Sequence, residues 1–520
     1  MANRRLIWLI LPTLAGCGAY SMDAGYGDSG AAGDRNFDGA ADEDGAGGWD
    51  TGYAPEEPDE DGLLPPATTD KYVFVANPDR NTVTRISAST LAVITTEVGV
   101  TPEVVRTTAD YTTAAVFNTG SDSVSIVDSE SLSVVEVAVR PNLNQMVLSP
   151  DGKVVACYHD AAARADTDLD DGALSFNEVS IVNLTTGAHI PMVVGFNPRE
   201  IRFTRDSTKM VVVSDSYLAI VDLSAATLEP VRVRISEDTV DPPAAEELVI
   251  TPDGQYAIVR QFGGEDLVVV NLADNSVERV DVGDDPTDID VTPDGARAVA
   301  VARGSRELWL YDLSDIFATP VIVDMPSDLV LGSLAMSPDG TKGLLYSTAT
   351  GDSRFASWDL TAEDPASSIT SYSSVKPLSG VRISPTGNTA MLLHDDSNGD
   401  TPSSSVFYNE YALTLLSLTD FFANPIRLPG EPDESATTED GELGFLIMKD
   451  QPWMLQLNFE TLIHESISLK SIAEHIGVIP DSQQVYISQN HELGRISFYE
   501  PSTGDMQTVT GFELNSGIEY

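Results

Sequence analysis

Basic residues are scarce in this chain of 520 residues. Its 29 Lys and Arg stand against 81 Asp and Glu, which gives a formal net charge of -52. Such a chain repels polyanions, so nucleic acid is excluded as a partner class, because its recognition depends on Lys and Arg neutralising phosphates. The acidic excess favours solubility and attracts cations, and it carries no information about the fold.

Cysteine is almost absent, since only Cys17 and Cys157 occur. If Cys17 is modified, as argued below, a single thiol remains and no intrachain disulfide can form. The protein must then rely on its hydrophobic core. Cys157 lies in the apolar run 154–158, which predicts a buried packing thiol, because free cysteine is among the most buried residue types.

The usual signatures of catalysis are also missing. The sequence has no Gly-x-Ser-x-Gly elbow, no His-Glu-x-x-His zinc motif, no phosphate-binding loop and no Cys-x-x-Cys pair. These absences lower the expectation of an enzyme without excluding a propeller lactonase, which uses dispersed His and acidic residues instead.

Residues 1–16 have the features of a signal peptide. Two arginines precede the apolar stretch 6–12, which is too short to span a bilayer as a helix. The run Leu14-Ala15-Gly16-Cys17 resembles a bacterial lipobox, in which the cysteine is acylated and becomes the mature N-terminus; the alternative is an ordinary signal peptide cleaved nearby. With Gly18 next, the resemblance implies an outer-membrane lipoprotein of the cell envelope, facing either the periplasm or the outside. Two or more acyl chains would anchor it stably.

Residues 17–70 are rich in Gly, Ala, Asp and Glu and poor in apolar residues. This composition predicts a disordered, self-repelling tether between the lipidated cysteine and a folded domain. Within it, Asp34, Asn36 and Asp38 reproduce the early ligand spacing of a calcium loop, but Gly45 stands where the closing Glu belongs. A solvated linker is the favoured interpretation, with weak calcium binding as the alternative.

From residue 71 onward a turn motif recurs at a spacing of about 45 residues. In its clearest copies Ser or Thr is followed by Pro, Asp and Gly; Pro fixes φ at the second position, and Asp and Gly tolerate the tight geometry that follows. Each copy therefore predicts a hairpin connection. The copies begin at Thr107, Ser149, Thr204, Thr251, Thr292, Ser337, Ser384, Thr438 and Ile479.

Short strands flank each turn. An apolar strand follows it, as at 154–158 and 298–301, and a polar loop then leads to another strand that ends in Asp or Asn, as at 124–128 and 218–222. Four short strands per unit, regular turns and no helical periodicity predict an all-β propeller of four-stranded blades over residues 71–520.

Three segments give this pattern a family resemblance. Tyr72–Asn77, Asn81–Val83 and Val98–Pro102 resemble the YVTN β-propeller repeat of bacterial and archaeal surface proteins. The TolB-like propeller, which also carries a Ser-Pro-Asp-Gly turn, is the alternative, but the Asn-Thr-Val segment and the Val-Gly-x-x-Pro closure favour the YVTN repeat.

About ten units are counted, more than the four to eight blades that are usual. Segment 71–98 supplies only three strands, and residues 511–520 have the pattern of a lone inner strand. Together the two ends would complete one blade and close the ring, which removes exposed sheet edges. No linker divides the array, so one large ring is favoured over two smaller rings.

Two loops that join the second and third strands of a unit are enlarged and share a pattern of His and carboxylates, and a third position of the same kind carries His and Glu. On one propeller face these groups would bind a divalent cation or a polar ligand; alternatively, His and Asp cap strand ends. The residues are His159, Asp160, Glu178, His394, Asp395, Glu410, His491 and Glu492, with Asp166, Asp168 and Asp170 as an imperfect calcium loop. Lone charges in the loops entering inner strands are expected to be solvated; these are Glu103, Arg199, Glu200, Glu246, Glu247 and Asp288.

Three hypotheses about function follow. The first is a monomeric, non-enzymatic lipoprotein that is attached to the membrane by its lipid and binds an envelope protein or glycan through the propeller face. The second is a metal-dependent lactonase-like hydrolase, and the third is a calcium-stabilised surface adhesin. No cofactor is certain, although calcium or another divalent cation is compatible with the acidic loops. Fold alone does not decide among them.

Overall fold

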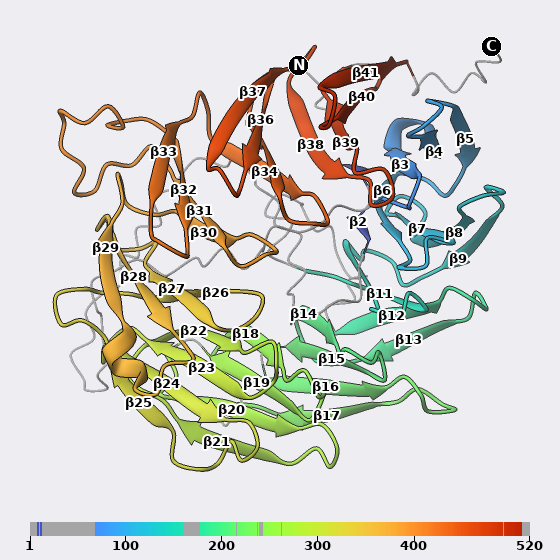
Figure 1. The fold of residues 1–520 in the computed structure, drawn as a ribbon. Helices are drawn as coiled ribbons and strands as arrows, with labels where there is room; N and C mark the ends of the chain where they lie inside the picture. Colours follow the sequence, from blue (N-terminus) through green and yellow to red (C-terminus); the bar gives the residue numbers. More distant parts are fainter. Residues whose placement is uncertain are drawn as a thin grey trace, which may run out of the picture.

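The computed structural model describes residues 68–511, except 161–176, 215, 237, 239–242, 262 and 492, together with the backbone of Trp8–Leu9 and Leu11–Pro12. Ten sheets are arranged as blades around one ring (Figure 1). The predicted all-β propeller, its single ring and its count of ten units are confirmed. The only helical elements in the described residues are two 3-10 turns, η1 (Pro78–Arg80) and η2 (Pro365–Ser368). No helix there is long and apolar enough to cross a membrane.

The strands of each blade follow one another in sequence from the axis of the ring outward. Blade 1 contains β3 (Tyr72–Asn77), β4 (Thr82–Ser87) and β5 (Val93–Glu97), and blade 2 contains β6 (Pro102–Thr107), β7 (Thr113–Asn118), β8 (Ser123–Asp128) and β9 (Val134–Ala138). Blade 3 contains β10 (Gln145–Leu148), β11 (Val154–Tyr158), β12 (Glu178–Asn183) and β13 (His189–Val193), and blade 4 contains β14 (Pro198–Phe203), β15 (Lys209–Ser214), β16 (Tyr217–Asp222) and β17 (Pro230–Arg234). Blade 5 contains β18 (Ala245–Ile250), β19 (Tyr256–Gln261), β20 (Asp266–Asn271) and β21 (Val277–Asp281). Blade 6 contains β22 (Pro286–Val291), β23 (Arg297–Ala302), β24 (Glu307–Asp312) and β25 (Val321–Asp324), and blade 7 contains β26 (Ser333–Met336), β27 (Lys342–Tyr346), β28 (Arg354–Asp359) and β29 (Thr370–Ser373). Blade 8 contains β30 (Gly380–Ile383), β31 (Thr389–His394), β32 (Ala412–Ser417) and β33 (Ala423–Arg427), and blade 9 contains β34 (Pro432–Thr437), β35 (Leu443–Met448), β36 (Trp453–Asn458) and β37 (Ile463–Ser468). Blade 10 contains β38 (Ala473–Val478), β39 (Val485–Gln489), β40 (Arg495–Glu500) and β41 (Asp505–Thr510).

In blades 2 to 10 the repeated turns connect the inner strand to the second strand, as predicted. At Ser149 the hydroxyl donates to the Asp151 carboxylate (2.8 Å), and the Gly152 N–H donates to the Ser149 carbonyl (2.9 Å). Gly152 has φ of +69°, a conformation that glycine adopts without steric cost. The turn is therefore set by its own side chains, which explains why the sequence motif marks it so clearly.

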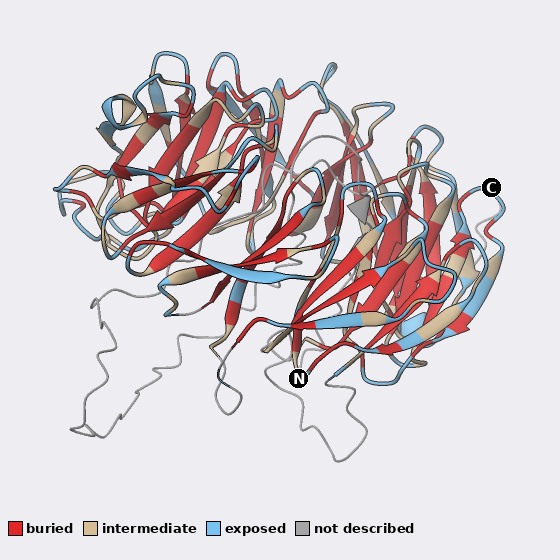
Figure 2. Ribbon diagram, turned by 90° about the horizontal axis from the view of Figure 1, so that it is seen from below, coloured by how far each residue is buried: buried red, intermediate tan, exposed pale blue. Residues whose placement is uncertain are grey.

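The hydrophobic core is divided into ten clusters, one at each contact between neighbouring blades. The cluster that closes the ring joins Val73 and Val75 of blade 1 to Ile479, Tyr486 and Phe498 of blade 10. Cys157 is fully buried in the cluster between blades 2 and 3, as predicted. Figure 2 shows that burial is concentrated in the inner and middle strands, whereas the outermost strands face solvent. Each sheet thus buries both of its faces against its neighbours.

Blade 1 is the exception to the strand order. It has three consecutive strands, as predicted, and its inner position beside β3 is taken by β1 (Trp8–Leu9), with Trp8 opposite Ala76 and Leu9 opposite Val75. A second short strand, β2 (Leu11–Pro12), pairs parallel with β6 of blade 2. This inner strand was expected from residues 511–520, of which all but Gly511 lie outside the described residues.

Asn81 of the Asn-Thr-Val segment ties blade 1 to blade 2. It adopts φ of +58°, and its side-chain carbonyl accepts the N–H of Thr101 (3.0 Å) in the loop that leads into β6. Asp122 repeats the arrangement one blade later, with φ of +49° and a bond from the N–H of Asn142 (3.0 Å). Asn and Asp tolerate this left-handed conformation better than most residues. The segment that resembles the repeat family therefore has a structural role.

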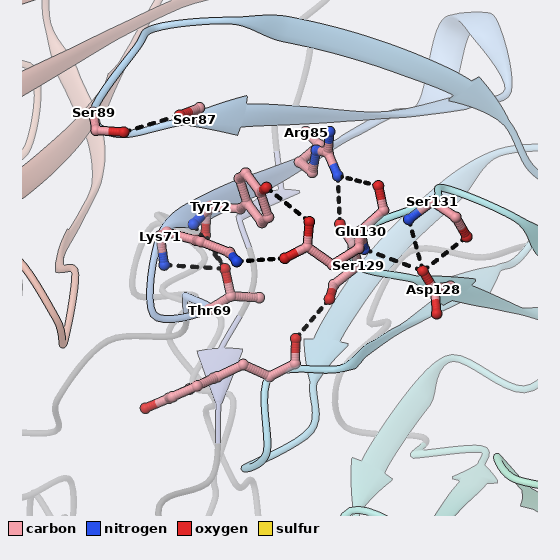
Figure 3. Close-up of polar contacts among 11 residues, drawn as sticks. Thr69, Lys71, Tyr72, Arg85, Ser87, Ser89, Asp128, Ser129, Glu130 and Ser131 are labelled. Carbon is pink, nitrogen blue, oxygen red and sulfur yellow. Dashed lines mark hydrogen bonds and ion pairs between the residues drawn. The ribbon is translucent and has the colours of Figure 1, made fainter.

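Arg85 of β4 also holds blades 1 and 2 together, through the turn between β8 and β9 (Figure 3). Its guanidinium donates to the carbonyls of Ser129 (2.6 Å) and Glu130 (2.7 Å) and lies 4.3 Å from the centroid of the Tyr72 ring. The Glu130 carboxylate in turn accepts the Tyr72 hydroxyl (3.0 Å) and pairs with Lys71. Since Arg85 is only 9% exposed, these bonds are shielded from water and stronger than surface pairs.

We expect Arg85→Met to lower the free energy of unfolding by about 2 kcal/mol, because two carbonyls lose a charged donor and the stacking on Tyr72 is lost. Thermal unfolding followed by circular dichroism measures the effect. Arg80→Met is the matched control, since Arg80 is exposed. Equal melting temperatures for the two variants would contradict the role assigned to Arg85.

Candidate functional site

The loops that join second to third strands lie on one face of the ring, together with the loops that lead from one blade to the next. We call this the loop face. Of its two enlarged loops, residues 161–176 lie outside the described residues, so the calcium-loop prediction at Asp166, Asp168 and Asp170 stays a prediction. The same holds for Asp34, Asn36, Asp38 and Cys17. The second enlarged loop, 395–411, is described in full.

His394 is the last residue of β31 and is completely buried. Its Nδ1 lies 2.8 Å from the carbonyl oxygen of Pro377, and its Nε2 lies 2.9 Å from the Thr414 hydroxyl. Burial lowers the pKa of His394 to about 4, although the Pro377 bond opposes that shift. The imidazole is therefore neutral near pH 7 and holds the loop entering β30 against its own blade.

His159 occupies the equivalent position of blade 3, directly after β11. It is 4% exposed, and its Nδ1 lies 2.9 Å from the carbonyl oxygen of Asn142. The next residue, Asp160, exchanges two hydrogen bonds with Asn144: its N–H donates to the side-chain carbonyl (2.7 Å) and its carbonyl accepts from the side-chain amide (2.8 Å). Glu178, at the far end of the loop, pairs with Arg140 at 2.9 Å.

The predicted His and carboxylate residues are not gathered in one place. His159 belongs to blade 3 and His394 to blade 8, five blades apart in a ring of ten. His491 follows β39 of blade 10, where its Nδ1 accepts the N–H of Leu493 (3.1 Å), and Glu492 lies outside the described residues. Among the residues that the structure describes, no group of three or more His, Cys, Asp or Glu is placed to hold a metal ion.

Lys376, which the sequence analysis did not single out, fastens loop 395–411. The side chain is fully buried, and Nζ donates to the carbonyls of Asp395 (2.7 Å) and Glu410 (2.7 Å), the two ends of the loop. Burial lowers the pKa of Lys376, and the charges of Asp395, Asp396 and Glu410 oppose this. The Asp395 carboxylate accepts the N–H of Ser397 (3.0 Å), and Glu410 lies 3.5 Å from Arg427.

The same loop is fastened to blade 7. The N–H of Asp400 donates to the Gly351 carbonyl (3.0 Å), and the Ser353 hydroxyl donates to the Asp400 carboxylate (3.0 Å). Gly399 has φ of +46°, and a Cβ there would lie 2.1 Å from the Gly351 oxygen, so no larger residue fits. Within this frame, Val406 is 72% and Tyr408 is 37% exposed. The loop is thus held in one conformation, in which the side chains of Val406 and Tyr408 are exposed to solvent.

Carboxylates around the axis bind the backbone of the next blade. Glu247 accepts the N–H of Ile289 (3.2 Å), and Asp288 accepts the N–H of Leu334 (2.6 Å). With exposures of 7% and 3%, Glu247 and Asp288 are buried, so the expectation that they are solvated was wrong. The carboxylate oxygens of Glu247 and Asp288 accept bonds from backbone N–H groups that would otherwise be buried without a partner.

A third hydrogen bond from a backbone N–H to a carboxylate of the preceding blade belongs to a charged cluster on the inner strands of blades 9 and 10. Glu434 accepts the N–H of Ile476 (3.1 Å) and lies 2.5 Å from Nδ1 of His475. Burial lowers the pKa of His475, but Glu434, Glu474 and Asp433 outweigh it and raise the pKa to about 9. Burial, with Glu434 nearby, raises the pKa of Asp433 to about 6. The cluster therefore carries a protonated imidazole at neutral pH.

Comparisons with known proteins show the fold and no more. No family model and no curated protein matches the chain. A eukaryotic initiation factor is similar over 77% of this chain and 97% of its own, with a TM-score of 0.50 and 12% identity. A dihydro-heme d1 dehydrogenase, NirN in complex with DHE, covers 77% of this chain and 73% of its own, with a TM-score of 0.43 and 14% identity. The hydrazine synthase of Kuenenia stuttgartiensis covers 59% and 94%, with a TM-score of 0.30 and 17% identity.

We expect Lys376→Met to loosen loop 395–411, because two backbone carbonyls at the ends of the loop lose their shared donor while the aliphatic packing is kept. Limited proteolysis should then cut the loop about tenfold faster, with the cut site mapped by mass spectrometry. Lys470→Met, at an exposed position in the connection between blades 9 and 10, is the control. Unchanged cleavage in Lys376→Met would show that the loop is held by other contacts.

We expect the His475 imidazole to titrate near pH 9, which NMR of labelled histidine would measure. Because the folded pKa lies above the ordinary value of 6.5, this residue stabilises the fold fully below pH 6.5, and the contribution is lost as the pH rises through about 9. Glu434→Gln should lower the titration midpoint by about one unit or more. Glu465→Gln, on the exposed outer strand of blade 9, should leave it unchanged. A midpoint below 7 in the unaltered protein would refute the assignment.

Proposed function

We propose that this protein is a cell-envelope lipoprotein of the YVTN-like repeat kind, which binds a partner protein or glycan through the loop face of its propeller and catalyses no reaction. The observation that carries the proposal is the construction of loop 395–411. Its ends are fastened by buried Lys376, its middle is fastened to blade 7, and Val406 and Tyr408 remain exposed. A fixed loop loses little conformational entropy on binding, which favours recognition.

The groups that catalysis would need have other tasks in the described residues. His394 is buried and bonded on both ring nitrogens. His159, which lies five blades from His394, contacts the backbone carbonyl of Asn142. A hydrolytic site needs its acid, base and metal ligands within a few ångströms of one another. This spacing favours the binding function over the hydrolase hypothesis.

The proposed envelope location is supported by the sequence. The run Leu14-Ala15-Gly16-Cys17 follows a basic start and a short apolar stretch, and the acidic segment 17–70 would separate the ring from the membrane surface. The net charge of -52 makes direct contact of the ring with an anionic lipid surface unfavourable. The loop face is then directed at a partner rather than at lipid.

The proposal is tested in intact cells by placing a photo-crosslinking amino acid at Tyr408. We expect a discrete higher-mass product of the membrane-associated protein, and we expect Lys376→Met to remove it, because that change releases the loop that presents residue 408. The matched control carries the crosslinker at Ile463, which is 64% exposed on the outer strand of blade 9, away from the loop face.

A fatty-acid label tests the anchor in the same cells. Label should appear on the unaltered protein and be absent from Cys17→Ala. Equal crosslinking from positions 408 and 463 would overturn the role of the loop face. Label that persists in Cys17→Ala would overturn the lipid anchor.

A further inference from the structure

The two limbs of loop 395–411 are bonded to each other. The Asn409 N–H donates to the side-chain carbonyl of Asn398 (2.7 Å), and the Asn398 side-chain amide donates to the side-chain carbonyl of Asn409. Gly399 and Asn409 have φ of +46° and +57°, in the left-handed region that Gly and Asn tolerate best. Because of these bonds, the carboxylates on either side of residue 398 and the apolar residues before residue 409 belong to one part of the loop.

This part of the loop is acidic and has no basic residue of its own. The loop contains four carboxylates and no Lys or Arg, and two of the carboxylates, Asp396 and Asp400, are exposed. The neighbouring arginines pair with other carboxylates: Arg427 lies 3.5 Å from Glu410, and Arg354 pairs with two aspartates outside the loop. The exposed carboxylates of the loop are therefore open to a cationic group from outside.

The surroundings of Tyr411 show that the negative surface continues toward blade 9. Burial raises the pKa of Tyr411, and the charges of Asp396, Glu431 and Asp395 raise it further, while Lys449 opposes them. The ammonium of Lys449 lies 2.9 Å from Glu431, so its charge is paired there. The carboxylates of loop 395–411 and of the connection to blade 9 thus form one acidic surface.

Two apolar side chains of the loop are exposed beside these carboxylates, Val406 at 72% and Tyr408 at 37%. An arginine guanidinium stacks on the face of an aromatic ring and donates in parallel to a carboxylate, so a tyrosine next to aspartates suits it well. An acidic glycan would be repelled by the same surface, and a neutral glycan would make no use of its charge. The arrangement favours a basic polypeptide over a sugar.

We propose that loop 395–411 recognises a basic segment of a partner protein, with an arginine stacked on Tyr408 beside Asp396 and Asp400 and an apolar side chain against Val406. The inference rests on the proposed function, because it names the partner class of the same loop. The net charge of -52 attracts such a segment from a distance, and the fixed loop then selects it by contact.

Binding of a fluorescent synthetic peptide to the full-length protein in non-ionic detergent tests the recognition. The peptide alternates Arg with Leu and Trp, and a second peptide has Glu in place of Arg. We expect the basic peptide alone to bind, with an affinity that falls as salt is added. Asp396→Asn combined with Asp400→Asn should weaken binding about fivefold, and Tyr408→Ser about tenfold.

Two further variants separate recognition from attraction by net charge. Glu278→Gln combined with Glu465→Gln removes the same charge from exposed positions on the outer strands β21 and β37, and it should change binding by less than about twofold. Lys376→Met makes the protein more negative but releases the loop, so we expect it to weaken binding. Equal losses from the two double variants, or tighter binding by Lys376→Met, would overturn the inference.

The photo-crosslinked product formed at position 408 in cells separates failure of the inference from failure of the proposed function. Sequencing of the attached fragment by mass spectrometry should find Lys or Arg beside the crosslink. A fragment without either residue, or a sugar, would overturn the inference and leave the proposed function in place. Equal crosslinking from positions 408 and 463 would overturn the proposed function, and the peptide series would then decide the inference by itself.

Discussion

Packing of each sheet against its two neighbours is the interaction on which the whole structure depends. Every blade contributes apolar residues to two clusters, and no cluster belongs to a single blade. A lone blade has no core, so stability grows with the number of contacts between neighbours, as in other repeat architectures. The contact between blades 10 and 1 then decides whether all ten blades are covered on both faces.

The polar contacts follow from this geometry. Sheets that pack face to face bring the inner strands of neighbouring blades close together, so a carboxylate on one inner strand can reach the backbone of the next. Glu247, Asp288 and Glu434 supply acceptors to the next blade, and Arg85 supplies a donor to two carbonyls. Each of these charges is bonded to a backbone group of the neighbouring blade, which holds the register between blades.

The sequence predicted the blades because their signals are local: most turns are closed by bonds among their own Ser or Thr, Asp and Gly, and the apolar strands lie within a few residues of them. It did not predict Lys376, whose acceptors are carbonyls of residues 395 and 410, because a carbonyl can belong to any residue type and leaves no trace in the sequence. For the same reason Glu247 and Asp288 resembled solvated charges. The histidine pattern was visible, yet sequence spacing could not show that His159 and His394 stand on opposite sides of the ring.

A ring of ten blades also limits where chemistry can occur. Side chains on opposite blades are kept apart by the width of the ring, so groups converge only between neighbours, as His475 and Glu434 do. Contacts that depend on convergence are thereby restricted to pairs of adjacent blades, and in three such pairs a carboxylate on one inner strand accepts a backbone N–H of the next. Loop 395–411 is held differently: its ends are bonded to Lys376 and its middle to blade 7. Blade number therefore sets the distance between opposite sites, while contacts between neighbouring blades hold the ring together.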